Sequence, residues 1–198
     1  MSLSDKDNFS NNPNNFCYEK LSRRDIRSLI FHLIYAIESF EYSVSLESIV
    51  DNFNRGMNLG IPDNSEALEI AKGIVAERQE LDKVIEPLLD NWRLDRIGVC
   101  TKLVLRLSIW ELKHTDTPSS IVINEAIELA KCFSEKDAYR FVNGILDEVC
   151  NIYRKDEVEQ KGQEEAEEAA QEIIQEMSEI AEEDGKKEKI KKKKKQKK

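Results

Sequence analysis

The chain has 198 residues, a mass of 22.9 kDa and a formal net charge of −9. This length suits one domain with an appendage and falls short of two full domains. Charged residues make up 35% of the chain, so a core is feasible only if they are segregated from the 40% that are hydrophobic. With 7 glycines and 4 prolines, the composition argues against a turn-rich β sandwich or a glycine-rich nucleotide fold and favours helices.

Cysteines and histidines are too sparse and too far apart to suggest a metal site. The 4 cysteines form no C-x-x-C pair, which also argues against a disulfide framework. His32 and His114 are separated by 82 positions, which excludes an H-E-x-x-H zinc motif. No phosphate-binding glycine motif occurs either, so we expect no catalytic site, no metal and no cofactor.

Apolar runs in the sequence are short, because charged residues interrupt each of them before the 18 or so positions that cross a bilayer. The first 16 residues are polar and rich in asparagine, unlike a secretory signal. We therefore expect a soluble cytoplasmic protein without a membrane segment.

Charge divides the chain into unlike pieces. Residues 1–154 carry 18 basic and 25 acidic groups. Residues 155–184 carry 2 basic and 13 acidic groups, and residues 185–198 carry 10 basic groups and 1 acidic group. We predict a disordered leader over 1–18, a helical domain over 19–154, and an acidic, then lysine-rich, low-complexity tail over 155–198. A short heptad-like seam in the tail predicts partial helix rather than a folded coiled coil. Nucleic acid could meet this acidic body only through a local basic patch.

Helical spacing begins with Ser22 and Asp25, which can form a capping box, and the first helix runs to about Phe40. Further helices are predicted from Leu46 and from Asn64.

Three more start signals follow. Asp95 is expected to cap a long helix, Ser120 opens the next, and Ser134 with Asp137 opens the last. The sum is six or seven helices without a convincing strand, which predicts an all-α domain.

Two packing details are also predicted within these helices. Gly144 is expected to let a neighbouring helix approach closely. Glu125 and Arg106 both lie beside apolar stripes, so we expect them to form an ion pair.

The densest basic patch of the body precedes and opens the first helix. Lys20, Arg23, Arg24 and Arg27 are spaced i, i+3, i+4 and i+7, which would place them on one side of a helix. A solvated polar face is the alternative interpretation of such a charge run.

A second cluster mixes cations with aromatic rings at the start of the last helix. Lys136, Tyr139, Arg140 and Phe141 combine the groups that bind RNA phosphates and unstacked bases. Phe141 could equally belong to the core.

Four motifs from Asn91 onward resemble the NusB family of bacterial transcription antitermination factors. They are N-W-R-L-D-R-I from Asn91, L-R-L-S-I-W-E-L from Leu105, I-N-E-A-I-E-L-A-K from Ile123 and F-V-N-G-I-L-D from Phe141. The segment from Ser22 to Tyr35 is similar to the family's arginine-rich first helix. Together these resemblances cover about residues 20–154.

The resemblance implies two small helical bundles and a role without catalysis. Family members pair with NusE, a small-subunit ribosomal protein, and hold boxA RNA near RNA polymerase during ribosomal RNA synthesis. By position, Arg23, Arg24 and Arg27 match arginines that meet RNA phosphates. Phe141 matches a residue at the RNA surface, with Asp137 and Arg140 beside it.

Two departures from the family limit this transfer. Asp25 interrupts the arginine run, which implies weak RNA binding by the chain alone, and Trp110 replaces the usual tyrosine.

Two alternatives stay open at this stage. An RNA-recruiting domain of a ribosomal RNA methyltransferase would need a further α/β domain, which the residues after Arg154 cannot supply. A helical module that binds only protein would leave the basic helix incidental. The sequence also leaves open a homodimer, the preferred RNA sequence, the residues that contact NusE and the role of the tail.

Overall fold

The computed structural model describes residues 17–89 and 93–153. Seven helices and no strand occur within these residues, which confirms the predicted all-α class. Six of the helices are α1 (Arg23–Ser39), α2 (Leu46–Met57), α3 (Glu66–Ala76), α4 (Arg78–Ile85), α5 (Val99–His114) and α6 (Ser119–Phe133). A final helix covers residues 138–153, and short 3-10 turns lie at Tyr18–Lys20, Glu86–Leu88 and Leu94–Arg96.

Several predictions concern other parts of the chain. Most of the predicted leader and the whole of the predicted tail, including its heptad-like seam, lie outside the described residues. Within the described ranges, no helix combines the length and apolar character that a bilayer crossing requires.

The start of α1 forms as its sequence predicts. Ser22 Oγ accepts a hydrogen bond from the Asp25 amide at 3.2 Å, and Asp25 Oδ2 accepts one from the Ser22 amide at 3.0 Å. This reciprocal capping box satisfies two amides that the first turn would otherwise leave unpaired. Because the helix starts after Ser22, Lys20 lies in the preceding 3-10 turn. The prediction that Lys20 shares a helical face with the arginines is therefore wrong.

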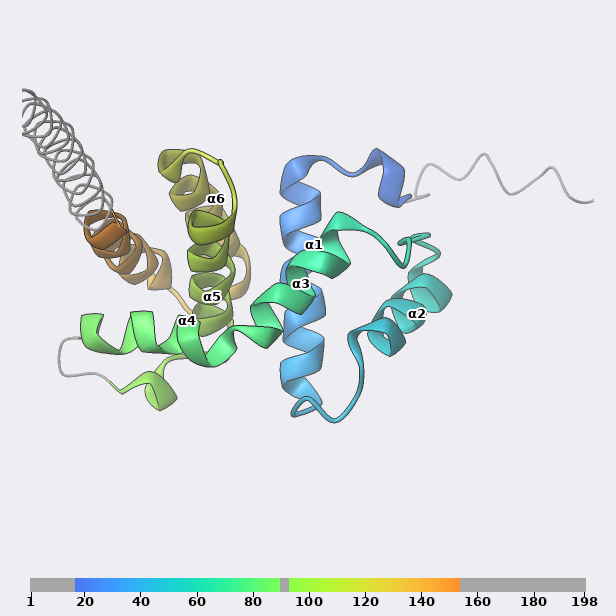
Figure 1. The fold of residues 1–198 in the computed structure, drawn as a ribbon, viewed down its shortest axis with the longest axis horizontal. Coiled ribbons are helices and arrows are strands. Elements are labelled where there is room, and N and C mark those ends of the chain that lie inside the picture. Colours follow the sequence, from blue (N-terminus) through green and yellow to red (C-terminus); the bar gives the residue numbers. More distant parts are fainter. Residues whose placement is uncertain (1–16, 90–92, 154–198) are drawn as a thin grey trace, which may run out of the picture. The chain divides into compact units, whose positions relative to one another are not determined.

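The helices pack in two groups (Figure 1). Helix α1 lies against α2 and α3, and α5 lies against α4 and α6. The two groups are joined where α1 and α3 contact α5 and where α3 contacts α4. Helix α1 contributes Ile30, Leu33 and Ile34 to the core, and α5 is buried over most of its length. Burial of these side chains is the main stabilising contribution.

Arg106 of α5 is the centre of a buried ionic network. Its Nε and Nη2 donate to Asp82 of α4 at 2.8 and 2.7 Å, and its Nη1 donates to Glu38 of α1 at 2.9 Å. Lys102 donates to the same Glu38 at 3.0 Å. Burial, together with a hydrogen bond to Glu38, raises the pKa of neighbouring Tyr42 to about 12. The predicted Arg106–Glu125 pair is wrong, because two nearer carboxylates satisfy this guanidinium.

The start of α5 also differs from its prediction. Asp95 lies in the 3-10 turn Leu94–Arg96 and accepts two hydrogen bonds from Arg93, at 3.0 and 2.7 Å. Helix α5 begins three residues later, after Gly98, whose backbone is extended. A Cβ atom at Gly98 would lie 1.6 Å from the Glu135 carboxylate. The Glu135 carboxylate, which accepts a hydrogen bond from the Thr101 hydroxyl at 2.9 Å, thus lies directly against the Gly98 backbone.

A close helix approach occurs at Gly73 of α3 rather than at Gly144. A Cβ atom at Gly73 would lie 2.7 Å from the indole of Trp110, which itself packs on His114. No atom of the described residues lies within 4 Å of a Cβ atom at Gly144, which is exposed. The prediction that Gly144 admits a neighbouring helix is therefore wrong, and Gly73 has that role against α5.

These two glycines predict opposite effects of alanine. Gly73→Ala should destabilise the fold, because overpacking against Trp110 costs about 1–3 kcal/mol and the gain in helix propensity offsets only about 1 kcal/mol. Gly144→Ala should stabilise the fold by up to about 1 kcal/mol. Urea unfolding of both variants measures the difference, and a Gly144→Ala protein less stable than Gly73→Ala would contradict this packing.

Candidate functional site

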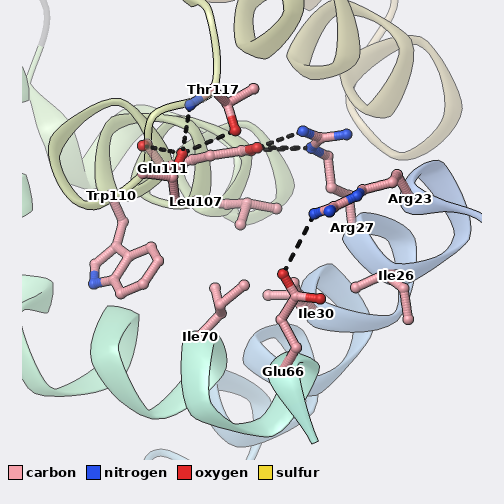
Figure 2. A pocket seen from close by; sticks show the side chains of 11 residues that line it. Arg23, Ile26, Arg27, Ile30, Glu66, Ile70, Leu107, Trp110, Glu111 and Thr117 are labelled. Carbon is pink, nitrogen blue, oxygen red and sulfur yellow. Dashed lines mark hydrogen bonds and ion pairs between the residues drawn. The ribbon is translucent and has the colours of Figure 1, made fainter.

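The three arginines of α1 face three carboxylates, each from a different helix. Arg23 pairs with Glu66 of α3, Arg24 with Glu125 of α6, and Arg27 with Glu111 of α5. Figure 2 shows the first and third of these pairs around a hollow of about 110 Å³ between α1, α3 and α5. The arginines therefore do not form one uniform basic face.

Arg27 is the inner member of this set. Its side chain is 12% exposed and that of Glu111 is 13% exposed. The guanidinium Nε donates to both Glu111 oxygens, at 3.1 and 3.0 Å, and Nη2 donates to Oε1. The hydrogen bonds that Arg27 donates to Glu111 raise the pKa of Arg27 more than burial lowers it. The pair ties α1 to α5 and leaves little of the Arg27 guanidinium open to a ligand.

Arg24 is held but stays on the surface. Its Nε and Nη2 donate to Glu125 at 3.0 and 2.7 Å, a forked geometry that fixes the guanidinium plane. The Arg24 side chain is 64% exposed, whereas that of Glu125 is 15% exposed. The hydrogen bond from Arg24 lowers the pKa of Glu125, so this carboxylate is ionised at neutral pH. Arg24 thus covers its carboxylate and retains Nη1 for another acceptor.

Arg23 and Lys20 are the open cations of this region. Arg23 is 86% exposed and its Nη1 lies 3.6 Å from Glu66, in a solvent-screened pair. Lys20 is exposed in the turn before α1. Both can reach an anionic ligand with little loss of internal contacts.

The second predicted cluster lies where α6 turns into the final helix. Asp137 is exposed and has a left-handed backbone with φ of 65°. This places it in the turn and not in a capping box with Ser134, whose buried hydroxyl has no hydrogen-bond partner among the described residues. The predicted Ser134–Asp137 cap is therefore wrong. Helix formation starts at residue 138, after this turn.

Arg140 and Phe141 stand in different surroundings. Arg140 is exposed, and its Nε donates to the Tyr139 hydroxyl at 3.2 Å. Phe141 is half-buried and lines a hollow of about 440 Å³ with Ile97, Thr101 and Ala138. The phenyl ring therefore contributes to packing and also borders a surface hollow.

The outer face of α6 connects the two clusters. Glu128 accepts a hydrogen bond from Lys131 at 2.8 Å, which is the main reason that its pKa is lowered, and the charge of Arg24 lowers it further. Lys131 Nζ in turn lies 5.5 Å from the centre of the Tyr139 ring. A continuous line of charged and aromatic side chains therefore runs from α1 across α6 to the final helix.

The sequence did not predict most of the carboxylates that hold the arginines. No local pattern marks these pairs, because the carboxylates lie far along the chain from Arg23, Arg27 and Arg24. The separations are 43 positions for Glu66, 84 for Glu111 and 101 for Glu125. Lys131 was missed as well, although it ends the I-N-E-A-I-E-L-A-K motif.

No group of three or more potential metal ligands occurs in the described residues. The candidate site is a surface of exposed cations beside aromatic rings.

Comparison with known proteins identifies the family. The sequence matches the NusB family over residues 24–151, which is more than half of the chain. The chain belongs to the NusB family. A transcription antitermination protein NusB of Macrococcus caseolyticus is 35% identical over 133 residues, covering 65% of this chain and 96% of that protein. Another, from Anaeromyxobacter dehalogenans, is 39% identical over 116 residues, covering 57% of this chain and 82% of that protein.

Solved structures agree with this assignment. T. maritima NusB superposes with a TM-score of 0.59 at 32% identity, covering 67% of this chain and 92% of that one. A structure of the antitermination factors NusB and NusE in complex with double-stranded RNA has a TM-score of 0.53 at 26% identity. The match covers 66% of this chain and 97% of that one. The NusB-like fold and the class of transcription antitermination factor, which is not enzymatic, are as predicted.

The burial of Arg27 predicts a structural role for it within the NusB fold. Arg27→Met should lower the free energy of unfolding by about 2–4 kcal/mol, because Glu111 is left without its partner. Adding Glu111→Gln should recover part of that loss, and a double-mutant cycle by chemical unfolding measures the coupling.

Arg23→Met is the matched control, because its pair is exposed. It should change the free energy of unfolding by no more than about 0.5 kcal/mol. Equal losses for Arg27→Met and Arg23→Met would refute the distinction between an inner and an outer arginine.

Proposed function

We propose that this NusB family protein binds boxA-type single-stranded RNA together with NusE and so supports antitermination by RNA polymerase during ribosomal RNA synthesis. The domain over residues 19–154 carries this function. The surface from α1 across α6 to the final helix is the RNA interface, and no step of the function is catalytic.

The observation that carries the proposal is the exposed, fixed guanidinium of Arg24 beside the open side chain of Arg23. The first 154 residues have a net charge of −7, so RNA must approach through local cations. Arg23 is 86% exposed and Arg24 is 64% exposed. Glu125 holds Arg24 in place from beneath, which reduces the ordering cost of a phosphate contact.

The predicted site residues divide into three roles in this proposal. Lys20, Arg23, Arg24 and Arg140 meet RNA phosphates, because all four are exposed cations. Phe141 and Asp137 border the RNA at the turn after α6, where an unstacked base can meet a ring edge. Arg27 acts through Glu111 by fixing α1 on α5, and this holds the other arginines in position.

The comparisons support the choice of partners. One similar structure contains NusB, NusE and RNA, and this chain covers 97% of that structure's matching chain. The RNA there is a duplex, whereas cations interspersed with aromatic rings favour single strands, as expected for boxA. NusE is expected to raise RNA affinity by extending the interface, since Asp25 reduces the charge of the α1 surface.

Fluorescence anisotropy tests the proposal directly. A labelled boxA-type RNA and a scrambled RNA are titrated with the protein over a series of salt concentrations, with and without NusE. Binding should prefer boxA and tighten with NusE. Arg23→Ala with Arg24→Ala should reduce the slope of log affinity against log salt by roughly 1.4, about 0.7 for each lost phosphate contact.

Arg55→Ala provides the matched control. Arg55 is an exposed arginine on α2 whose hydrogen bonds, among the described residues, go to its own helix at Asp51 and Asn52, so its loss should leave the slope unchanged. Tight NusE binding without any gain in RNA affinity would instead show a module that binds only protein. A slope reduced by about 0.7 in Arg55→Ala, as much as each arginine of α1 contributes, would indicate general electrostatic attraction and no defined surface.

A further inference from the structure

Tyr139 gathers two cations from different helices onto one ring. Lys131 Nζ, from the last turn of α6, lies 5.5 Å from the ring centre, and Arg140 Cζ, from the final helix, lies 5.7 Å from it. Arg140 also donates its Nε proton to the Tyr139 hydroxyl at 3.2 Å. The ring therefore holds a lysine and an arginine that are nine residues apart in the sequence.

The turn between the helices makes this meeting possible. Helix α6 ends at Phe133 and the next helix begins at residue 138, after Asp137 in its left-handed conformation. The reversal within a few residues brings the first turn of one helix beside the last turn of the other. Tyr139, the second residue of the final helix, thereby reaches Lys131.

Both cations remain available to a ligand. Lys131 is 48% exposed, and its partner Glu128 is 46% exposed, so solvent screens that pair. Arg140 is exposed, and among the described residues its only side-chain hydrogen bond goes to the neutral Tyr139 hydroxyl. Within the described part of the chain, neither cation is paired with a buried carboxylate. The two side chains can therefore contact one anionic group together, such as a phosphate of the RNA backbone.

We infer that Lys131 and Arg140, positioned by Tyr139, form a second phosphate-binding site for the RNA, separate from the arginines of α1. This inference rests on the proposed function and adds Lys131 and Tyr139 to the interface. Tyr139 is a positioning residue: its ring stays against the two cations, and the cations contact phosphate. Glu125, which holds Arg24, and Lys131 lie six residues apart on α6, so the RNA backbone passes over the outer face of α6 from one site to the other.

The test compares salt dependence with sequence preference. Tyr139→Leu removes both the ring face and the hydroxyl, so the two cations lose their common support. We expect boxA affinity to fall about 3-fold to 10-fold and the salt slope to fall by about 0.7–1.4. The ratio of boxA to scrambled affinity should stay unchanged, because phosphate contacts carry no sequence information.

Tyr139→Phe is the conservative control. It keeps the ring and removes only the hydrogen bond from Arg140, so the slope should stay close to that of the unaltered protein. Lys131→Met with Arg140→Met should reproduce the slope of Tyr139→Leu, and adding Tyr139→Leu to that double variant should cause no further change. Thermal unfolding and NusE affinity, measured on each variant, separate these effects from a loss of fold.

The outcomes are distinguishable. A Tyr139→Leu protein with an unchanged slope and a reduced boxA preference would show that the ring stacks on a base, and this would overturn the positioning role. An unchanged slope with unchanged preference, or a loss of NusE affinity instead of RNA affinity, would overturn the site itself. Failure of the unaltered protein to bind boxA RNA with NusE would overturn the proposed function.

Discussion

The ion pair between Arg27 and Glu111 fixes the helix on which the proposed RNA surface depends. It joins α1 to α5 at a point where both side chains are nearly buried, so the pair resists salt far better than an exposed pair would. The position of α1 then determines where Arg23 and Arg24 emerge. Glu125 and Glu111 are largely buried beside their arginines, whereas the carboxylate of Glu66 stays exposed beside Arg23.

Helix α6 has a comparable role at the other end of the surface. It carries Glu125, which holds Arg24, then Glu128, and then Lys131 beside Tyr139. These residues follow one another at helical spacings of three, so they lie along one side of α6. Helix α6 thus holds Arg24 of α1 and places its own Lys131 beside a ring of the final helix, and this makes the surface continuous.

Local signals in the sequence predicted much of the fold. The capping box at Ser22 and the apolar spacing after it placed α1 correctly, because both depend on residues a few positions apart. The local signal at Asp95 gave a wrong helix start, because Asp95 accepts hydrogen bonds from Arg93 in a 3-10 turn and α5 begins only after Gly98. The resemblance to the NusB family then supplied the function, which periodicity alone could not.

The site was predictable only in part. Arg23, Arg24 and Arg140 were found as exposed cations, but the burial of Arg27 depends on a carboxylate 84 positions away. The close approach expected at Gly144 occurs at Gly73 instead, because the size of the facing side chain, Trp110, decides which glycine is needed. Tertiary partners, and not residue type, separate the cations that hold the fold from those that face a ligand.

The most direct test of this division is NMR of the arginine side chains. Proton–nitrogen correlation spectra of the Nε groups are recorded for the labelled protein with unlabelled NusE, before and after boxA-type RNA is added. The account predicts that the signals of Arg23, Arg24 and Arg140 shift, while those of Arg27 and Arg106 stay in place. A large shift of Arg27 with unchanged Arg23 and Arg24 signals would contradict it.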